Sequence, residues 1–284
     1  MQMQIFDIYS SCGLERPRDA SAGTLRVWSV STPKEISRKR LRPGILILPG
    51  GGYRYTSPRE AEPVALRFLA LGYVPFVLDY SCAPCGYPVS LREAAMAMRF
   101  IRENAAGFEV NPHMVAAMGF SAGGHLCGCL GTLFDCPEVS DIAPAGTVRP
   151  DALGLCYPVA VSWGKTHDGS FLALTRGDEA LRSRLSLEKL VRPDMPPVYL
   201  WHTRDDGSVN VRNSLILSQA LHEQDVDFAM HIYRSGRHGL STANRMSCDA
   251  SYLSGISEDI PGWIDEMVRF FAEKGFGLRD CGAE

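Results

Sequence analysis

A serine between two glycines is the first feature of this sequence that points to chemistry. Gly119-Phe120-Ser121-Ala122-Gly123 fits the pattern G-x-S-x-G, in which a nucleophilic serine sits on a tight turn between a strand and a helix. An apolar run, 114–118, precedes this turn, and a small-residue run that can be helical, 122–134, follows it. Because the pattern is short, a connection built only for packing explains it equally well. A base, an acid and an oxyanion hole are needed to decide.

The base has one strong candidate, His238. A serine hydroxyl is a poor nucleophile until a base accepts its proton and a third group orients that base. His238 follows the last expected strand, and the glycines at 236 and 239 leave room for an exposed imidazole. Among the rivals, His167 lies in an irregular segment and is the one we expect to line a pocket. The others lie in or directly before expected helices and strands, where a structural role is favoured: His113, His125, His202, His222 and His231.

The acid candidate lies in a turn rich in carboxylates, directly after the strand expected at 198–203. Asp205 and Asp206 are both suitable. We favour Asp206, because Val209 comes three residues later and can pack back to fix the turn. For Asp205 we expect only that it initiates the turn or caps the next helix.

Three consecutive glycines follow an early strand and are the candidate oxyanion hole. The backbone N–H groups of Gly51 and Gly52, together with that of Ala122 directly after the serine, are expected to hold the developing negative charge. The glycine run does not predict a phosphate site, because it lacks the lysine of a P-loop and the spacing of a dinucleotide fingerprint. A plain flexible turn is the alternative.

The elements that must position these residues alternate between strands and helices. This alternation predicts an α/β fold with a mostly parallel central sheet and helices on both faces, in which ligands bind at the carboxyl ends of the strands. We expect a single domain, 1–284, with the irregular segment 158–197 as a small lid or pocket wall. Strands are expected at 25–30, 45–48, 74–80, 114–118, 153–157, 198–203 and 228–233, and helices at 58–71, 90–104, 122–134, 178–185, 187–191, 211–224 and 261–274. The first of these helices is expected to bury one face: Ala61, Val64, Ala65, Phe68 and Leu71.

Composition and charge exclude several classes of protein. The chain has 284 residues, of which 45% are apolar and 21% charged, as in an ordinary globular protein. A net charge of -3 gives no reason to expect a nucleic acid or a membrane as a partner. No apolar run reaches the length of a membrane span, and residues 1–9 lack the pattern of a signal peptide.

The cysteines favour a cytoplasmic location. There are nine, scattered along the chain, and several lie in expected core elements, as free thiols do in a reducing compartment. Cys82 and Cys85 have a spacing known from redox and zinc sites, but no second pair lies nearby, so we expect two free thiols there.

On these residues the chain resembles the α/β-hydrolase superfamily, and within it the acetyl esterase and acetylxylan-esterase-like group. The order Ser121, Asp206, His238 is the triad order of that superfamily. The resemblance covers most of the chain, 43–238. It is carried by Pro49-Gly50-Gly51-Gly52-Tyr53, Arg59-Glu60-Ala61-Glu62-Pro63-Val64-Ala65, Gly119-Phe120-Ser121-Ala122-Gly123-Gly124-His125-Leu126, Pro193-Asp194-Met195-Pro196-Pro197, Trp201-His202-Thr203 with Asp205-Asp206, and Gly236-Arg237-His238-Gly239-Leu240.

The resemblance implies hydrolysis of short acyl esters, often acetyl groups on plant-polysaccharide sugars. It places the nucleophile on Ser121, the acid on Asp206 and the base on His238. We therefore expect a serine esterase that needs no cofactor and no metal and acts on a small-molecule or oligosaccharide ester. Two departures bear on the substrate: Asn210 stands where the superfamily commonly has proline, and the stretch 241–260 looks individual.

Bulky side chains near the glycine run predict a small acyl pocket. They are Tyr53, Tyr55 and Tyr157, of which we expect Tyr53 and Tyr157 to bind the substrate. Two alternatives to the esterase stay open. One is a serine amidase or peptidase of the same fold, and the other is a binding protein of this fold that has lost catalysis. The presence of candidates for all three triad positions disfavours the binding protein.

Overall fold

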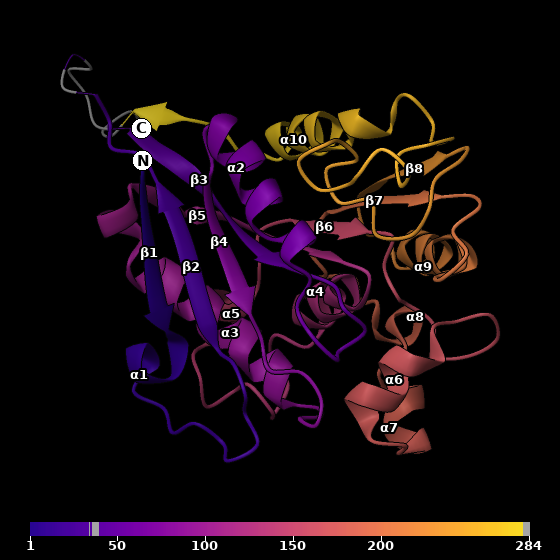
Figure 1. Cartoon of the computed structure of the whole chain (residues 1–284). Coiled ribbons are helices and arrows are strands. Elements are labelled where there is room, and N and C mark those ends of the chain that lie inside the picture. Colours follow the sequence, from indigo (N-terminus) through magenta and orange to yellow (C-terminus); the bar gives the residue numbers. More distant parts are fainter. Residues whose placement is uncertain (34, 36–39, 281–284) are drawn as a thin grey trace.

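The computed structural model describes residues 1–33, 35 and 40–280, and their strands form one mostly parallel sheet (Figure 1). The order across the sheet is β1-β2-β4-β3-β5-β6-β7-β8, and the two-residue strand β9 pairs with the start of β3. The β1–β2 and β2–β4 pairs are antiparallel, and all pairs from β4 to β8 are parallel. The strands are β1 (Gln2–Asp7), β2 (Thr24–Ser29), β3 (Arg40–Leu48), β4 (Val74–Asp79), β5 (Val110–Phe120), β6 (Leu153–Cys156), β7 (Val198–Thr203), β8 (Phe228–Tyr233) and β9 (Arg279–Asp280).

Helices cover both faces of the sheet (Figure 1). Helices α2 and α10 pack on one face, and α1, α3, α4 and α9 pack on the other. The α-helices are α1 (Ile8–Cys12), α2 (Glu62–Ala70), α3 (Val89–Glu103), α4 (Ala122–Thr132), α5 (Ala145–Val148), α6 (Asp168–Thr175), α7 (Glu179–Arg184), α8 (Leu187–Leu190), α9 (Arg212–Glu223) and α10 (Trp263–Glu273). Short 3-10 helices are η1 (Pro58–Glu60), η2 (Ala105–Phe108) and η3 (Ile260–Gly262).

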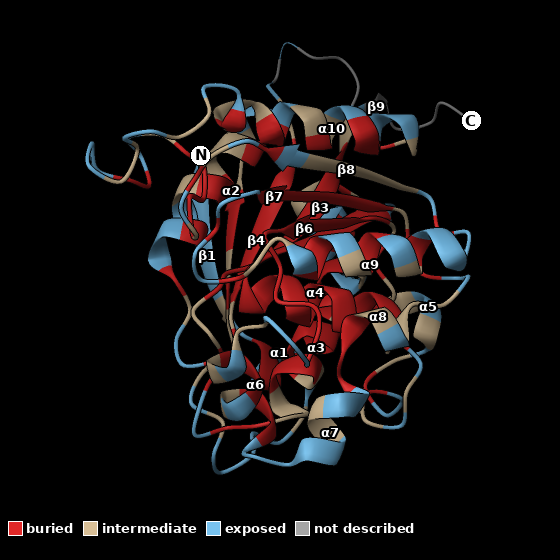
Figure 2. Cartoon of the chain, turned by 90° about the vertical axis from the view of Figure 1, so that its right-hand side faces the viewer, coloured by how far each residue is buried: buried red, intermediate tan, exposed pale blue. Residues whose placement is uncertain are grey.

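Strand β3 shows why the core lies on both sides of the sheet. Successive side chains of a strand point to opposite faces. Ile45 and Ile47 pack with α2 and α10, whereas Leu46 and Leu48 pack with the helices of the other face, and all four are fully buried. A continuous apolar run therefore suits this central parallel strand. Figure 2 shows the same pattern, with the inner strands and the whole of α4 in red.

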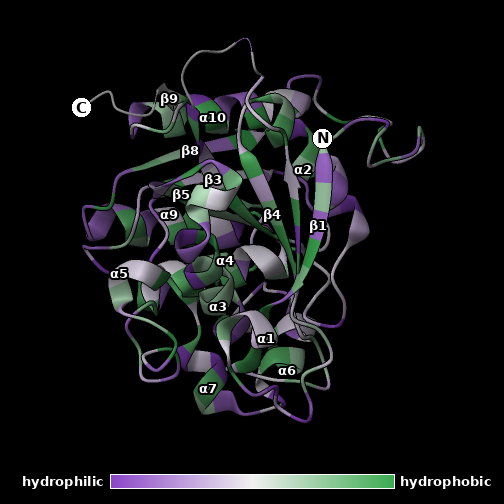
Figure 3. Ribbon diagram, turned by 90° about the vertical axis from the view of Figure 1, so that its left-hand side faces the viewer, coloured by the Kyte–Doolittle hydropathy of each residue, from purple (hydrophilic) through white to green (hydrophobic). Residues whose placement is uncertain are grey.

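The structure confirms the mostly parallel sheet with helices on both faces, and each expected strand and helix has a counterpart. One core residue was predicted wrongly: Leu71 is 39% exposed, because it follows the end of α2 as the C-cap. Strand β1 was not predicted. It lies at the sheet edge, where polar and apolar residues alternate (Figure 3) and only one side of the strand is paired. Helix α6 was not predicted either, because its segment shows no clear apolar period.

Candidate active site

Ser121 lies on the turn between β5 and α4, with a φ of 53° and a ψ of −118°. A positive φ is uncommon for a residue with a side chain, and such strain costs on the order of 1–3 kcal/mol. The two flanking glycines allow the turn to close. A Cβ at Gly119 would lie 2.1 Å from the carbonyl oxygen of Gly123, and one at Gly123 would lie 2.1 Å from that of Leu48. The turn therefore requires both glycines and presents the serine at the carboxyl end of a central strand.

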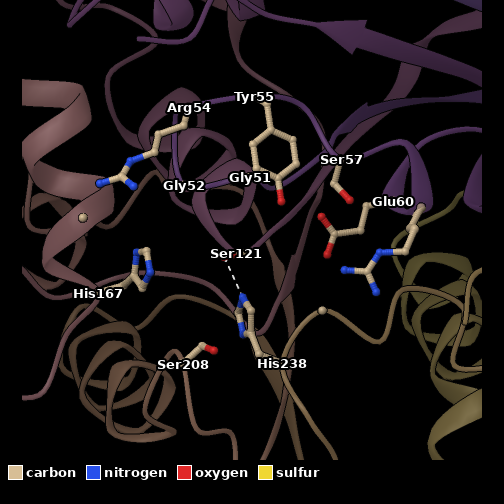
Figure 4. Close-up of a pocket in the computed structure, with 13 residues that line it drawn as sticks. Gly51, Gly52, Arg54, Tyr55, Ser57, Glu60, Ser121, His167, Ser208 and His238 are labelled. Carbon is tan, nitrogen blue, oxygen red and sulfur yellow. Dashed lines mark hydrogen bonds between the residues drawn. The ribbon is translucent and has the colours of Figure 1, made fainter. Parts of the chain in front are cut away.

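A hydrogen-bond relay connects Ser121 to two side chains from later strand ends. Nε2 of His238, which follows β8, lies 2.9 Å from Oγ of Ser121 (Figure 4). Nδ1 of the same ring lies 2.7 Å from Oδ2 of Asp206, which follows β7. A carboxylate oxygen accepts, so this network assigns the imidazole proton to Nδ1 and leaves Nε2 free to accept the serine proton. The structure thus brings together the three residues that the sequence predicts as a triad.

Asp206 is held in its ionised form by the groups around it. Oδ1 accepts the backbone N–H groups of Ser208 and Val209, at 2.8 and 2.9 Å, and Oδ2 faces His238 and His202. Burial alone raises the pKa of this carboxyl, but the hydrogen bonds from His202 and His238 hold the pKa well below that of an ordinary aspartate. Val209, on which the preference for Asp206 rested, is fully buried, and its side chain packs with Val159 and Phe171.

Asp205 does more than the sequence predicts. It neither caps α9 nor serves only the local turn. Its carboxylate accepts the backbone N–H of Gly236 and the hydroxyl of Ser235, both at 2.7 Å. These bonds tie the turn after β7 to the turn that carries His238. The first turn of α9 is instead served by Asn210, whose Oδ1 accepts the N–H of Arg212 at 3.0 Å.

The glycine loop presents two free backbone donors at the pocket. Within the described part of the chain, the N–H groups of Gly51 and Gly52 have no hydrogen-bond acceptor, whereas the N–H of Gly50 donates to Glu60. Gly51 has a φ of 129°, and a Cβ there would lie 2.0 Å from the carbonyl oxygen of Tyr55, so this position accepts glycine alone. The N–H of Ala122 belongs to the first turn of α4, whose donors have no partner within the helix.

Three of the other histidines lie near the site: His125 and His202 are buried, and His167 lines the pocket. His125 is buried between the hydroxyl of Tyr53 and the carbonyl oxygen of Leu185, both 2.8 Å away, and burial lowers its pKa to about 4. His202 is buried behind Asp206. His167 lines the pocket, as predicted for the rival of His238. Its Nδ1 pairs with Ser170, and among the described residues no hydrogen bond joins it to the triad.

Tyr53 and Tyr157 do not line the pocket, contrary to the prediction that they bind the substrate. Both are buried, with exposed fractions of 3% and 2%. The Tyr53 hydroxyl is engaged with His125, and the Tyr157 hydroxyl donates to Glu60 and accepts the N–H of Ser241. Both have a positive φ. Tyr55 lines the pocket in their place.

Glu60 is a site residue that the sequence does not reveal. It lines the pocket, yet it is only 3% exposed. Oε2 accepts the N–H of Gly50 and Oε1 accepts the hydroxyl of Tyr157, each at 2.8 Å. The ring of Tyr157 packs edge-on against His238, with centroids 5.1 Å apart. Glu60 therefore links the glycine loop to the surroundings of His238. Burial raises its pKa, while its hydrogen bonds and the nearby positive groups act in the opposite direction.

Ser121 opens into a pocket of about 320 Å³ (Figure 4). Within the described part of the chain, no aliphatic side chain contributes to its lining, which consists of Gly51, Gly52, Arg54, Tyr55, Ser57, Arg59, Glu60, Ser121, His167, Gly169, Ser208, His238 and Gly239. Residues 1–33, 35 and 40–280 contain no group of three or more His, Cys, Asp or Glu residues arranged to hold a metal ion. No helix among these residues has the length and apolar character of a membrane span.

Comparisons with known proteins identify relatives of this chain. The model of the BD-FAE family matches residues 30–143, and the model of the Prolyl oligopeptidase family matches residues 97–252, more than half of the chain. Among solved structures, an acetyl ester-xyloside bifunctional hydrolase from Caldicellulosiruptor lactoaceticus is 35% identical, with a TM-score of 0.77. The match covers 89% of this chain and 88% of that one.

Two curated relatives are longer proteins. Endo-1,4-beta-xylanase B of Butyrivibrio fibrisolvens is 37% identical over 70% of this chain, and an acetylxylan esterase of Xylanibacter ruminicola is 26% identical over 78% of it. The matches span 33% and 45% of those relatives, less than half of either length. The chain belongs to the α/β-hydrolase superfamily, where it matches the Prolyl oligopeptidase family model and groups with esterases.

Proposed function

We propose that this chain is a serine carboxylesterase that removes short acyl groups, chiefly acetyl, from carbohydrate alcohols such as xylan-derived oligosaccharides. The observation that carries the proposal is the relay from Ser121 through His238 to Asp206, beside two N–H groups of the glycine loop that have no acceptor among the described residues. A nucleophile, a base, an orienting acid and an oxyanion site are the parts that acyl transfer needs.

The reaction follows from these positions. Oγ of Ser121 bonds to the acyl carbon while its proton passes to Nε2 of His238. The carbonyl oxygen becomes an oxyanion, held by the N–H groups of Gly51, Gly52 and Ala122. The bond from the acyl carbon to the alcohol oxygen then breaks, and the alcohol leaves with the proton from His238. A water molecule gives a proton to His238 and attacks the acyl-enzyme. The serine oxygen departs with that proton, and the carboxylic acid is released.

The lining of the pocket supports a short acyl group and a polar alcohol. A long acyl chain needs apolar surface to leave water, at roughly 25 cal/mol per Å² buried. The lining of the described pocket offers glycines, one tyrosine, two histidines and charged or hydroxyl side chains instead. The names of the related acetylxylan esterase and acetyl ester-xyloside hydrolase support an acetylated sugar as the substrate. We also propose that segment 158–197 serves as a pocket wall, because His167 and Gly169 belong to the lining.

Hydrolysis of a nitrophenyl ester series, from acetyl to long chains, tests the proposal with wild type and Ser121→Ala side by side. We expect fast turnover of the acetate, a steep fall with chain length, and loss of turnover in the variant. Acetylated xylo-oligosaccharides would follow. A preference for long chains would refute the small acyl pocket, and near-wild-type rates in Ser121→Ala would refute the nucleophile.

A second candidate is a serine peptidase or amidase, which the match to the Prolyl oligopeptidase family over 97–252 favours. The same relay serves amide hydrolysis. Aminoacyl nitroanilides decide between the two: cleavage faster than that of nitrophenyl acetate would support the peptidase.

A cytoplasmic location also remains a proposal. The eight cysteines of the described residues are free, and seven of them are buried, as expected in a reducing compartment. Fractionation of the producing cells tests it.

A further inference from the structure

His167 has one ring nitrogen occupied by its own helix. It is the N-cap of α6, and its Nδ1 accepts the backbone N–H of Ser170 at 3.2 Å, with Oγ of Ser170 2.8 Å away. A neutral imidazole has one donor and one acceptor nitrogen. A backbone N–H can only donate, so this network assigns the His167 proton to Nε2.

The other side of the ring faces the pocket. Figure 4 shows His167 across the pocket from Glu60, with Ser121 and His238 between them. Within the described part of the chain, Nε2 of His167 has no hydrogen-bond partner. The ring also lies against the glycine loop, since a Cβ at Gly52 would be 3.7 Å from its Cε1. His167 therefore holds an unused N–H donor beside the reacting groups.

The surroundings keep this donor uncharged. Burial is the main cause that lowers the pKa of His167, and repulsion from Arg54 and from His238 in its protonated form lowers it further. Asp168 and Asp206 act in the opposite direction without reversing the shift. At neutral pH the ring is therefore a neutral imidazole of fixed tautomer, which donates a hydrogen bond and attracts no particular charge.

The acyl half of the ester has no use for such a donor. An acetyl group has a single polar atom outside the ester link, its carbonyl oxygen, and the proposed oxyanion donors Gly51, Gly52 and Ala122 already serve it. The methyl group accepts nothing. An additional N–H donor in the pocket can therefore be used only by oxygen atoms of the alcohol half.

We propose that His167 determines specificity for the alcohol half of the ester, by donating from Nε2–H to a hydroxyl or ring oxygen beside the ester bond. The substrate class is a polyhydroxylated alcohol such as a sugar. The inference rests on the proposed esterase function and goes beyond it, because it assigns one side chain to recognition of the leaving group. Arg54 lies beside His167, because a Cβ built on Gly169 would be 3.4 Å from Nη2 of Arg54 and 3.5 Å from Cε1 of His167. The Arg54 guanidinium is therefore a second hydrogen-bond donor on this side of the pocket.

The variant His167→Asn separates recognition from helix capping. Oδ1 of asparagine occupies nearly the position of Nδ1, and asparagine is a good N-cap residue, so the bond to the N–H of Ser170 can persist. The Nε2–H group is lost. Asp178→Ala is the matched control, because Asp178 caps the neighbouring helix α7 through the N–H of Leu181 and does not line the pocket.

The measurement compares two acetates on each protein: a mono-O-acetyl methyl xyloside, and cyclohexyl acetate, which has a ring without hydroxyl groups. The ratio of their kcat/KM values should fall roughly fivefold in His167→Asn, as the loss of one neutral hydrogen bond predicts. It should stay at the wild-type value in Asp178→Ala.

An unchanged ratio in His167→Asn, with the wild type active, overturns the role of His167 and leaves the proposed function standing. An equal fall in Asp178→Ala also overturns it, since the effect then belongs to the segment. If the wild type hydrolyses neither acetate, the proposed function fails and this inference fails with it.

Discussion

Nε2 of His202 lies 3.3 Å from Oδ2 of Asp206, so one carboxylate oxygen faces two imidazoles. His202 is fully buried. Its Nδ1 is 2.7 Å from Oγ of Ser214, and its Nε2 is 2.9 Å from the carbonyl oxygen of Val209. A carbonyl oxygen only accepts, so the network places a proton on Nε2. His202 is therefore a donor that holds the acid of the proposed triad from within the sheet.

His202→Phe is expected to lower kcat about tenfold and the free energy of unfolding by about 2–3 kcal/mol. Asp206 loses a donor, and the Val209 carbonyl and the Ser214 hydroxyl are left buried without a partner. His202→Gln, whose amide can donate toward the same oxygens, should recover part of both losses. Nitrophenyl acetate kinetics and urea unfolding measure the two effects. A wild-type kcat in the phenylalanine variant would show that His202 only fills space.

The two neighbouring aspartates give a sharp comparison. Asp206→Asn should lower kcat by about 10³–10⁴-fold, because an amide N–H in place of an acceptor oxygen favours the wrong tautomer of His238. Asp205→Asn should lower kcat tenfold or less, since Asp205 only ties the His238 turn to Ser235 and Gly236. Steady-state kinetics of both variants on nitrophenyl acetate provide the test. The reverse order of effects would move the acid to Asp205.

The proposed triad was accessible from the sequence because each member carries a local signal. Ser121 sits between glycines that the turn requires, and Asp206 and His238 each follow an apolar run that forms a parallel strand. Parallel strands end at one edge of the sheet. Three strand ends that are distant in the sequence therefore had to meet. In the structure the His238 side chain lies within hydrogen-bonding distance of both Ser121 and Asp206.

The contacts that support the proposed triad could not be predicted, because they join residues far apart in the chain and no local sequence pattern marks either partner. Glu60 is the last residue of the short 3-10 helix η1, and nothing local indicates that Tyr157, 97 positions later, will donate to it. Aromatic residues near the glycine run suggested pocket walls. The Tyr53 side chain instead points inward to His125, 72 positions later, and periodicity does not encode such a distant contact.

The strained backbone of Ser121 predicts a difference between two inactive variants. Ser121→Ala and Ser121→Gly both lose the nucleophile and the bond to His238. Only glycine adopts a φ of 53° with a ψ of −118° without strain, whereas alanine retains the cost. Glycine also raises the entropy of the unfolded chain, which offsets part of this gain. Ser121→Gly should still be the more stable variant, by about 1 kcal/mol. Urea unfolding of both proteins measures this. Equal stabilities would mean that the turn stores no strain.

Gly51 and Gly52 are expected to respond differently to the same substitution. In Gly51→Ala the new Cβ would lie 2.0 Å from a carbonyl oxygen, so the loop must move and kcat should fall about 100-fold or more as oxyanion donors shift. In Gly52→Ala the nearest atom is 3.7 Å away, and the φ of 65° is accessible to alanine at about 1 kcal/mol. This variant should lose far less activity. Kinetics and thermal unfolding of the two variants test the ranking, which an equal loss of kcat would contradict.

Replacement of Glu60 is expected to change the pH profile of kcat/KM as well as kcat. A carboxylate at Glu60 and a positively charged His238 attract each other, and this attraction is one of the causes that lower the pKa of Glu60. Glu60→Gln should therefore move the acid limb of the kcat/KM profile to lower pH, because the base then stays unprotonated further into acid. It should also lower kcat about tenfold, since an amide cannot accept at both former oxygens, and the N–H of Gly50 or the hydroxyl of Tyr157 loses its partner.

Glu60 and Asp206 make the stability of the fold depend on pH in opposite directions. Burial raises the pKa of Glu60. As the pH falls, the Glu60 carboxylate therefore becomes protonated at a higher pH in the folded chain than in the unfolded chain. Its contribution to stability therefore decreases as the pH rises from about 4.3 through the folded pKa. Asp206, with its lowered pKa, contributes stability that is present above about pH 4 and is lost in stronger acid.

Urea unfolding between pH 3 and 8, together with kcat/KM profiles between pH 5 and 9, separates these effects. Glu60→Gln should flatten the part of the stability curve above about pH 4 and leave the acid loss from Asp206 in place. Glu62→Gln is the matched control, because Glu62 is an exposed carboxylate two residues away and does not line the pocket. It should reproduce the wild-type pH profile. If the acid limbs of Glu60→Gln and wild type coincide, Glu60 does not act on His238, and its place in the pocket wall serves packing alone.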